Sequence, residues 1–192
     1  MTDTAFYARP DDLGRLAALY ARGLDGRAAR FNSLDGAARQ WPAMLSGGGG
    51  LVSTAADYQR FLQLLLPWSD GAAVSPAGEL DGVRLLSPHT VGYMGRYHLP
   101  GNRDLEQFGR PINAEAPQRG TGFGLGFGVV IDPVPGRVVC SPGELSWGGA
   151  ASTAFWIDPA QQLTASFFTQ LIPSSAHPIR SQLRQLVYQA LL

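Results

Sequence analysis

The chain has 192 residues, a length that fits one domain with a core of normal size. Apolar residues make up 45% of it and charged residues only 16%, a composition that excludes an intrinsically disordered protein. The 15 basic and 15 acidic residues cancel, so there is no basic surface stripe to neutralise phosphates, and nucleic-acid binding is excluded as a main function.

Several other classes of function lack the residues that they require. Cys140 is the single cysteine, and His89, His98 and His177 stand far from it and from each other in sequence, so we predict no disulfide, no metal site and no cofactor. No apolar run approaches the roughly 20 residues of a membrane-spanning helix, and charged residues interrupt the first positions, where a signal peptide needs an apolar core. The expected location is cytoplasmic, unless a segment that precedes Met1 directs the protein elsewhere.

The first part of the chain contains one weak helix signal and a long irregular segment. Asp11 or Asp12 could start a short amphipathic helix that ends before Gly23, because apolar residues follow at helical spacing. Residues 23–46 show no clear period and predict an irregular surface segment. The four glycines at 47–50 lack the lysine and Ser/Thr of a phosphate-binding loop, which favours a flexible turn.

Two further helices have clear start signals. Thr54 can cap the amide of Asp57, and apolar residues then lie on one face until Pro67 ends the pattern. Ser87 and Pro88 form a second start signal, a cap followed by proline at the first helical position. Residues 68–83 and 98–121 are predicted to be mainly loop.

The period changes from 3.6 to two residues at Phe123. Apolar residues alternate with glycines from Gly122 to Ile131, which predicts a strand with one core face and one bare face. Residues 132–136 form a turn and 137–141 a short strand in this interpretation. A further strand is expected from Leu163 to Gln170, and Pro178 starts a closing helix at 178–191 with an apolar face.

Residues 143–159 predict a β-hairpin around which the chain is organised. Leu145 and Trp147 alternate into Gly148 and Gly149, and residues 153–157 return as a β-branched and aromatic strand. Glycine weakens a strand and is usually retained where another backbone or a ligand comes close. The pair of glycines beside Trp147 therefore indicates either the wall of a binding site or tight packing within the sheet.

The order of elements predicts an α+β fold: an antiparallel sheet with helices and a C-terminal helix packed on it. We expect a mainly helical and loop region at 1–122 and antiparallel strands plus the C-terminal helix at 123–192. Together these regions would form part of one larger domain.

Motifs of self-contained hydrolases are not evident in the chain. Ser146 has Glu144 and Gly148 where a nucleophile elbow has two glycines, and no serine or histidine is marked out as a member of a Ser-His-Asp triad. A triad built from residues distant in sequence stays open as an alternative.

Six segments of the chain carry a resemblance when they are taken together and in order. They are Met-Thr-Asp-Thr at 1–4, 47–57 with Phe61 and Leu62, 81–88, 124–128, Trp-Gly-Gly at 147–149 and Trp-Ile-Asp-Pro at 156–159. As a set they resemble the serine β-lactamase-related hydrolases, with the class C-like, family VIII carboxylesterase branch as the nearest. The resemblance covers nearly all of this chain but only the C-terminal half of such proteins. It implies the C-terminal part of the serine β-lactamase/penicillin-binding-protein-like fold.

Catalysis in that family depends on three motifs, of which this chain has one. Trp147, Gly148 and Gly149 match the esterase form of the strand motif, and the resemblance implies that they bind substrate while the backbone N–H of Ala150 is one of two oxyanion-hole donors. A Ser-x-x-Lys motif cannot occur, because all 15 basic residues are arginine. The chain alone is therefore expected to be inactive.

The resemblance also implies partners. A complete protein of this type would act on a small ester or amide through an acyl-enzyme, and the missing N-terminal half or a partner chain would cover an open sheet. The alternative is a non-catalytic module that binds a ligand or partner along its glycine-lined strand. No nucleic-acid or membrane partner is expected.

Overall fold

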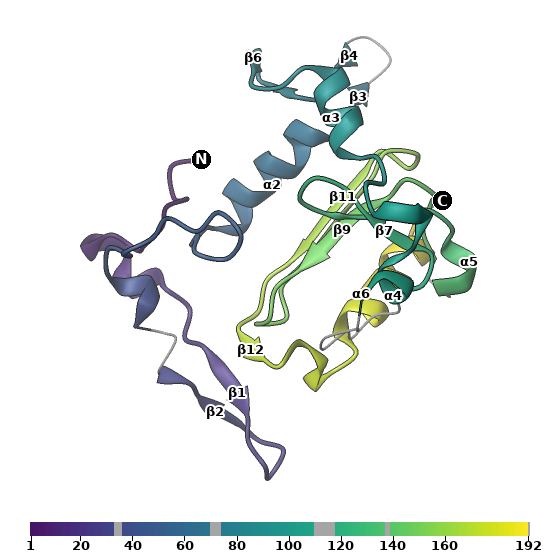
Figure 1. Ribbon diagram of the computed structural model, residues 1–192. Coiled ribbons are helices and arrows are strands. Elements are labelled where there is room, and N and C mark those ends of the chain that lie inside the picture. The colour runs from purple at the N-terminus through teal and green to yellow at the C-terminus, as the bar shows by residue number, and fades with distance from the viewer. Residues whose placement is uncertain (33–35, 70–73, 110–117, 137–138, 192) are drawn as a thin grey trace.

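The computed structural model describes residues 1–32, 36–69, 74–109, 118–136 and 139–191. The described residues form an antiparallel five-stranded sheet in the order β11-β10-β9-β8-β7 (Figure 1). The strands are β7 (Thr121–Phe123), β8 (Gly128–Val130), β9 (Leu145–Gly148), β10 (Ala154–Asp158) and β11 (Leu163–Phe167). This arrangement confirms the predicted α+β fold with an antiparallel meander.

The predicted hairpin is formed by β9 and β10, with Gly148 opposite Ala154 and Leu145 opposite Ile157. Alternate residues of β10 point to opposite faces of the sheet, as the period of two requires. Phe155 and Ile157 face one side, and Trp156 and Asp158 face the other. All four are buried, so this strand is covered on both faces.

Helices α2 (Ala55–Leu65) and α3 (Pro88–Met94) begin as their start signals predict. The Thr54 hydroxyl accepts a hydrogen bond of 3.3 Å from the Asp57 N–H, and Ser87 accepts one of 3.0 Å from the Thr90 N–H. Each cap satisfies one of the amides that the first helical turn leaves without a partner. Local sequence thus determined where both helices begin.

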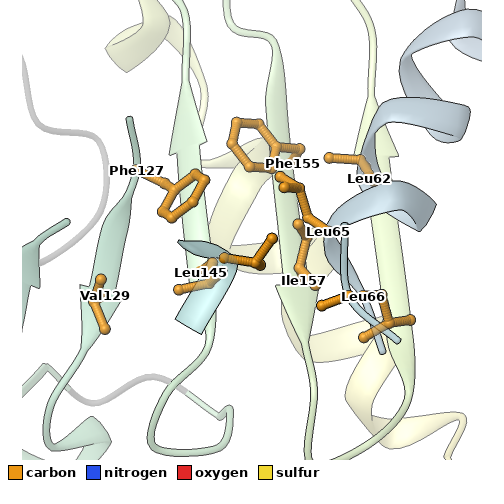
Figure 2. Close-up of a cluster of buried hydrophobic side chains, with 10 residues drawn as sticks. Leu62, Leu65, Leu66, Phe127, Val129, Leu145, Phe155 and Ile157 are labelled. Carbon is orange, nitrogen blue, oxygen red and sulfur yellow. The ribbon is translucent and has the colours of Figure 1, made fainter. Parts of the chain in front are cut away.

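The core lies between α2 and the first face of the sheet. In Figure 2, Leu62, Leu65 and Leu66 point from the end of α2 toward the sheet. They pack with Phe127, which directly precedes β8, and with four side chains from three strands, namely Val129, Leu145, Phe155 and Ile157. Leu62 and Ile157 have no exposed surface, so removing either side chain would leave a cavity.

Helix α6 (Ile179–Gln189) covers the second face of the sheet. A stripe of polar side chains one turn apart makes its contacts: Arg180 bonds the β9–β10 turn, Arg184 lies 5.3 Å from the Trp156 ring centroid, and Tyr188 bonds Asp158. The predicted apolar face is only partly correct, because Leu186 is 62% exposed. The helix is attached chiefly by hydrogen bonds and an ion pair.

The helix expected after Asp12 is wrong beyond its first turns. A 3₁₀-helix, η1 (Pro10–Arg15), is followed by extended chain and by β1 (Tyr20–Arg22). Strand β1 pairs with β2 (Ala28–Arg30) and, in parallel, with β12 (Leu171–Ile172). Pairing with a segment some 150 positions away in sequence overrides a weak local preference for helix.

The single strand predicted from Gly122 to Ile131 is also wrong, since the chain forms the β7–β8 hairpin there. Gly126 has φ of 114° at the reversal, a backbone conformation that side chains disfavour. Gly124 admits the end of α3, because a Cβ at this position would lie 2.2 Å from the Met94 carbonyl oxygen. Leu125, expected on the core face, is 48% exposed as a result.

Short elements occupy segments that were predicted to be irregular, loop or turn. They are η2 (Ala37–Arg39), β3 (Trp68–Ser69), β4 (Val74–Ser75), β5 (Glu79–Leu80), β6 (Val83–Arg84), η3 (Pro100–Asn102), α4 (Leu105–Phe108) and α5 (Pro133–Gly136). A further short element, η4 (Ser174–Ala176), lies where no element was predicted. The strand predicted at 137–141 is absent from its described residues, 139–141, and residues 137–138 lie outside the described part. Ser141 is instead held by Asp158, whose Oδ2 accepts its N–H at 3.2 Å. No helix in the described part of the chain is long and apolar enough to cross a membrane.

Candidate functional site

The site predicted from Trp147 to Ala150 lies at the turn end of the β9–β10 hairpin. Trp147 and Gly148 end strand β9, and Gly149 and Ala150 begin the turn to β10. The structure therefore brings together all four residues, as their adjacency in sequence requires. What the geometry adds is how each is held.

Trp147 lies at the margin of the core, 43% exposed. Its ring meets the Phe123 ring edge-to-face, with centroids 4.8 Å apart and an interplanar angle of 79°. The tryptophan also extends over Gly128 of β8, where a Cβ would lie 3.5 Å from its ring. Trp147 and Phe123 form a half-exposed aromatic surface beside the turn, suited to an apolar group.

The turn from Gly149 to Ser152 is a β-turn closed by a 3.1 Å hydrogen bond from the Ser152 N–H to the Gly149 carbonyl. Gly149 also donates its N–H to the Thr153 carbonyl and hydroxyl oxygens, at 3.0 and 3.2 Å. Leu171 accepts from the Ser152 hydroxyl at 2.6 Å and donates to the Ala151 carbonyl at 3.1 Å. The turn is thus fixed both by its own bonds and by the segment that leads to β12.

The Ala150 N–H takes no part in these hydrogen bonds, and the Ala151 N–H likewise donates none among the described residues. Ala150 is exposed, and its amide donates no hydrogen bond to a described residue. The second residue of a β-turn does not use its N–H in the turn's own hydrogen bond, so this amide remains available to an incoming acceptor. A fixed turn with an available donor is the geometry that electrostatic stabilisation of an oxyanion requires.

Arg180 is a contributor that sequence reasoning missed. Its Nη2 donates to the Gly149 carbonyl at 2.5 Å and to the Thr153 carbonyl at 2.8 Å. A signal existed in the sequence: an arginine directly after Pro178 stands in the first turn of a helix, where the helix dipole disfavours a cation. Such a residue is more often retained for a specific contact than for helix stability.

The two glycines have reasons within the protein itself. A Cβ on Gly148 would lie 2.6 Å from the Thr153 carbonyl oxygen and 2.7 Å from Arg180 Cζ. A Cβ on Gly149 would lie 2.6 Å from the Thr153 hydroxyl oxygen. Close approach of protein atoms therefore explains both positions, whereas the sequence alone left open whether a ligand or packing was responsible.

The opposite end of the hairpin carries a buried polar network. Glu144 and Asp158 have no exposed surface, and the Tyr188 hydroxyl lies 2.8 Å from Glu144 Oε2 and 2.6 Å from Asp158 Oδ2. Arg184 forms an ion pair with the other Glu144 oxygen. Because a hydroxyl has one proton, both Tyr188 contacts are hydrogen bonds only when one carboxyl is protonated.

Burial sets the ionisation behaviour of this network. Desolvation raises the pKa of Glu144 above its ordinary value, in spite of the opposing effect of the Arg184 charge. Burial also raises the pKa of the neighbouring Cys140 thiol to about 12, and that of the Tyr188 hydroxyl above its usual range. Cys140 is therefore a poor nucleophile, as its position in the sequence had indicated.

Histidine chemistry finds no support in the described residues. The His98 ring nitrogen Nε2 lies 2.8 Å from the Tyr93 carbonyl oxygen, and the two rings meet edge-to-face. No hydrogen bond joins a histidine to a serine or carboxylate side chain in the described part of the chain, and no group of three potential metal ligands occurs there.

Comparison with known proteins establishes the family. The model of the Beta-lactamase family matches residues 1–189, so the chain belongs to this family. Two Mycobacterium tuberculosis proteins, Rv1367c of strain H37Rv and the uncharacterised protein MT1414 of strain CDC 1551, are 36% identical to it over 177 residues. That match takes in 90% of this chain and 40% of each relative, so the chain spans less than half the length of these relatives.

Solved structures with a similar fold belong to acyltransferases and hydrolases. Simvastatin synthase (LovD) from Aspergillus terreus superimposes with a TM-score of 0.71 at 25% identity, over 100% of this chain and 46% of that one. A mutant of it, LovD6, gives a TM-score of 0.72 at 26% identity, over 98% and 47%. EstCE1, described as a hydrolase with promiscuous acyltransferase activity, shares the fold with a TM-score of 0.72 at 22% identity, over 97% and 46%. The fold is therefore that of the serine β-lactamase-type hydrolases and acyltransferases.

Proposed function

We propose that this chain supplies the strand-and-turn half of a serine-hydrolase active site that cleaves or transfers small acyl groups through an acyl-enzyme. The Ala150 N–H would be one oxyanion-hole donor, and Trp147, Gly148 and Gly149 would line the bound ester or amide. The observation that carries the proposal is the bonded turn in which the exposed Ala150 amide donates no hydrogen bond to a described residue. Membership of the Beta-lactamase family supports it.

The nucleophile and its activating base would come from outside these 192 residues. The chain has no lysine, so it cannot contain a Ser-x-x-Lys motif. It also leaves room for more protein: β11 is an edge of the described sheet, and Trp41 and Met44 are 69% and 73% exposed. We propose that a segment or chain equivalent to the other half of the family fold covers these surfaces.

A test uses both the isolated chain and a chimera. The purified chain should not hydrolyse short p-nitrophenyl esters above background, and no serine in it should react with a fluorophosphonate probe. A chimera in which this chain replaces the matched 40% of Rv1367c should hydrolyse the esters at a rate comparable to that of Rv1367c itself. Stoichiometric labelling of the isolated chain would instead favour a triad within it.

A non-catalytic binding module is the second candidate. The observation in its favour is that Arg180 and Thr153 already account for the glycines, which removes one reason to expect a substrate along the strand. An Rv1367c that hydrolyses esters, beside a folded chimera that does not, would support this candidate and contradict the first.

A further inference from the structure

Helix α6 contacts the candidate site through the guanidinium group of Arg180. Arg180 Nη2 donates to the Gly149 carbonyl at 2.5 Å and to the Thr153 carbonyl at 2.8 Å. These carbonyls belong to the residues on either side of the segment 150–152. One rigid cation therefore spans the base of the turn that presents the Ala150 amide.

The position of the guanidinium depends on the absence of a side chain at Gly148. A Cβ there would lie 2.7 Å from Arg180 Cζ, closer than real Cβ atoms approach a heavy atom. Gly148 and Arg180 thus form a matched pair, one residue providing the space that the other occupies. The same contact explains why a cation is retained in the first turn of α6, where the helix dipole disfavours it.

The remaining contacts of the turn leave a specific role for Arg180. The Ser152 hydroxyl and the Leu171 amide hold the far side of the turn, at Ala151 and Ser152. The near side, at Gly149, is held by Thr153, by the turn's own bond from the Ser152 N–H to the Gly149 carbonyl, and by Arg180 as a second donor to that carbonyl. The direction of the Ala150 N–H follows from the orientation of the peptide plane between Gly149 and Ala150, and the Gly149 carbonyl that Arg180 binds is the other half of that same peptide.

We propose that Arg180 is a positioning residue for the oxyanion donor: by binding the Gly149 carbonyl it fixes the peptide plane that carries the Ala150 N–H. This inference rests on the proposed function of Ala150, but the contact itself is independent of it. A planar guanidinium can hold two carbonyls in one geometry, whereas the lysine ammonium is a point charge on a flexible stem. Replacement by lysine should therefore keep the charge and lose the fixed orientation.

The first experiment measures order in the isolated ¹⁵N-labelled chain. In the native sequence the Ala150 amide should have an order parameter of about 0.85, the value of rigid backbone, and in Arg180→Lys and Arg180→Gln it should fall toward about 0.6. The amides of β9 and β10 should keep their values in both variants. Arg184→Lys is the matched control, because it alters a neighbouring arginine of the same helix that binds Glu144 and not the turn.

Two outcomes would overturn the positioning role at this stage. Ala150 could stay rigid in both Arg180 variants, which would show that the remaining bonds suffice. Alternatively, Arg184→Lys could loosen the turn as much as Arg180→Lys, which would show that general docking of α6 is responsible. The lysine variant keeps the test decisive even where Arg180→Gln does not fold.

The second experiment links order to catalysis in the Rv1367c chimera. Arg180→Lys should lower kcat about tenfold with KM unchanged, less than the roughly 100- to 1000-fold loss of an entire oxyanion donor, because the misoriented amide is weakened in the transition state only. A loosened turn with unchanged kcat would overturn the catalytic role and leave the structural contact standing. A chimera that is inactive even with Arg180 intact would contradict the proposed function, while the order parameters would still report on the contact.

Discussion

The two ends of the β9–β10 hairpin are held by the same helix in opposite ways. At the end opposite the turn, which we call the network end, Glu144 and Asp158 have no exposed surface. Side chains of α6 bind both Glu144 oxygens and Asp158 Oδ2, and backbone amides of Ala160 and Gln161 bind Asp158 Oδ1. At the turn end, Arg180 binds the backbone carbonyls of Gly149 and Thr153, and the Ala150 amide is left without an acceptor among the described residues. The carboxyl oxygens at the network end all have partners within the protein, whereas the Ala150 amide at the turn end has none among the described residues.

This difference indicates a division of labour along α6. Arg184 and Tyr188 hold the helix on the sheet through buried charge and hydrogen bonds, and Arg180, one turn before Arg184, uses that fixed helix as a base. A donor that must be available to a substrate cannot be held by its own hydrogen bond, so its orientation has to come from neighbouring groups. The network end holds α6 rigidly, and orienting the Ala150 amide through Arg180 requires that rigidity.

The largest effect is expected from breaking the Arg184–Glu144 ion pair at the network end. Arg184→Met would leave the Glu144 carboxyl buried without its cation, and we expect a loss of about 3–5 kcal/mol in the free energy of unfolding. Urea denaturation of the purified chain at pH 7 measures it. Glu144→Gln, which keeps an acceptor and gains a donor for Tyr188, is the control and should cost about 1 kcal/mol. Equal losses in the two variants would mean that the ion pair is not what secures α6.

Ala150→Pro removes the free backbone N–H at the turn end. In the Rv1367c chimera we expect ester turnover to fall about 100- to 1000-fold, roughly 3–4 kcal/mol, which is typical of losing one oxyanion donor. Proline can also distort the turn because its ring fixes φ, so Ala150→Val, which keeps the N–H, is the necessary control. If both variants stay folded by circular dichroism and lose equal activity, Ala150 is not the donor.

Gly148→Ala tests whether a side chain fits at position 148, beside the Arg180 guanidinium and the Thr153 carbonyl that it binds. The added Cβ would meet the Thr153 carbonyl at 2.6 Å and Arg180 Cζ at 2.7 Å, so either the backbone or the guanidinium must move. Overpacking of this kind costs about 1–3 kcal/mol, and thermal unfolding should show it. Gly47→Ala, at a position where a Cβ meets nothing within 4 Å, should leave stability nearly unchanged.

The contribution of the network end to the free energy of unfolding should also change with pH, in a direction that the pKa of Glu144 defines. Burial raises the pKa of Glu144 in the folded protein above its unfolded value, so the folded state binds this proton more readily. The stabilisation by that proton is fully present below the unfolded pKa and is lost as pH rises through the folded pKa. Relative to Glu144→Gln, the native protein should therefore lose unfolding free energy as pH rises above 4.5, the ordinary pKa of a glutamate, in urea titrations. A gain as pH rises above this value would show that attraction to Arg184 outweighs burial.

The smallest effect concerns Cys140, which lies beside the network end. Burial raises the pKa of this thiol to about 12, so at pH 8 it should react with a thiol reagent far more slowly in the native protein than in urea. Arg184→Lys should change this rate little, because burial and not the arginine dominates. Rapid modification of the native protein would mean that local unfolding readily exposes the Cys140 thiol at the network end.

The sequence by itself determined the elements whose signals are local. Thr54 and Ser87 cap their helices through residues three positions ahead, and the alternation around Trp147 produces a hairpin because strand side chains alternate at every second residue. The candidate site was equally local, since its four residues are adjacent. The absence of lysine excluded one catalytic motif with no structure at all.

Only the tertiary structure decided the contacts between distant segments. Residues 20–22 became a strand because they pair with 171–172, and a helical pattern in the first segment could not reveal that partner. The roles of Arg180 and Tyr188 depend on which face of α6 meets the sheet, and polar contacts formed that face where the sequence pattern favoured apolar ones. Helical periodicity predicts a face from hydrophobicity alone, whereas a hydrogen bond or ion pair depends on a partner whose position is fixed only when the chain has folded.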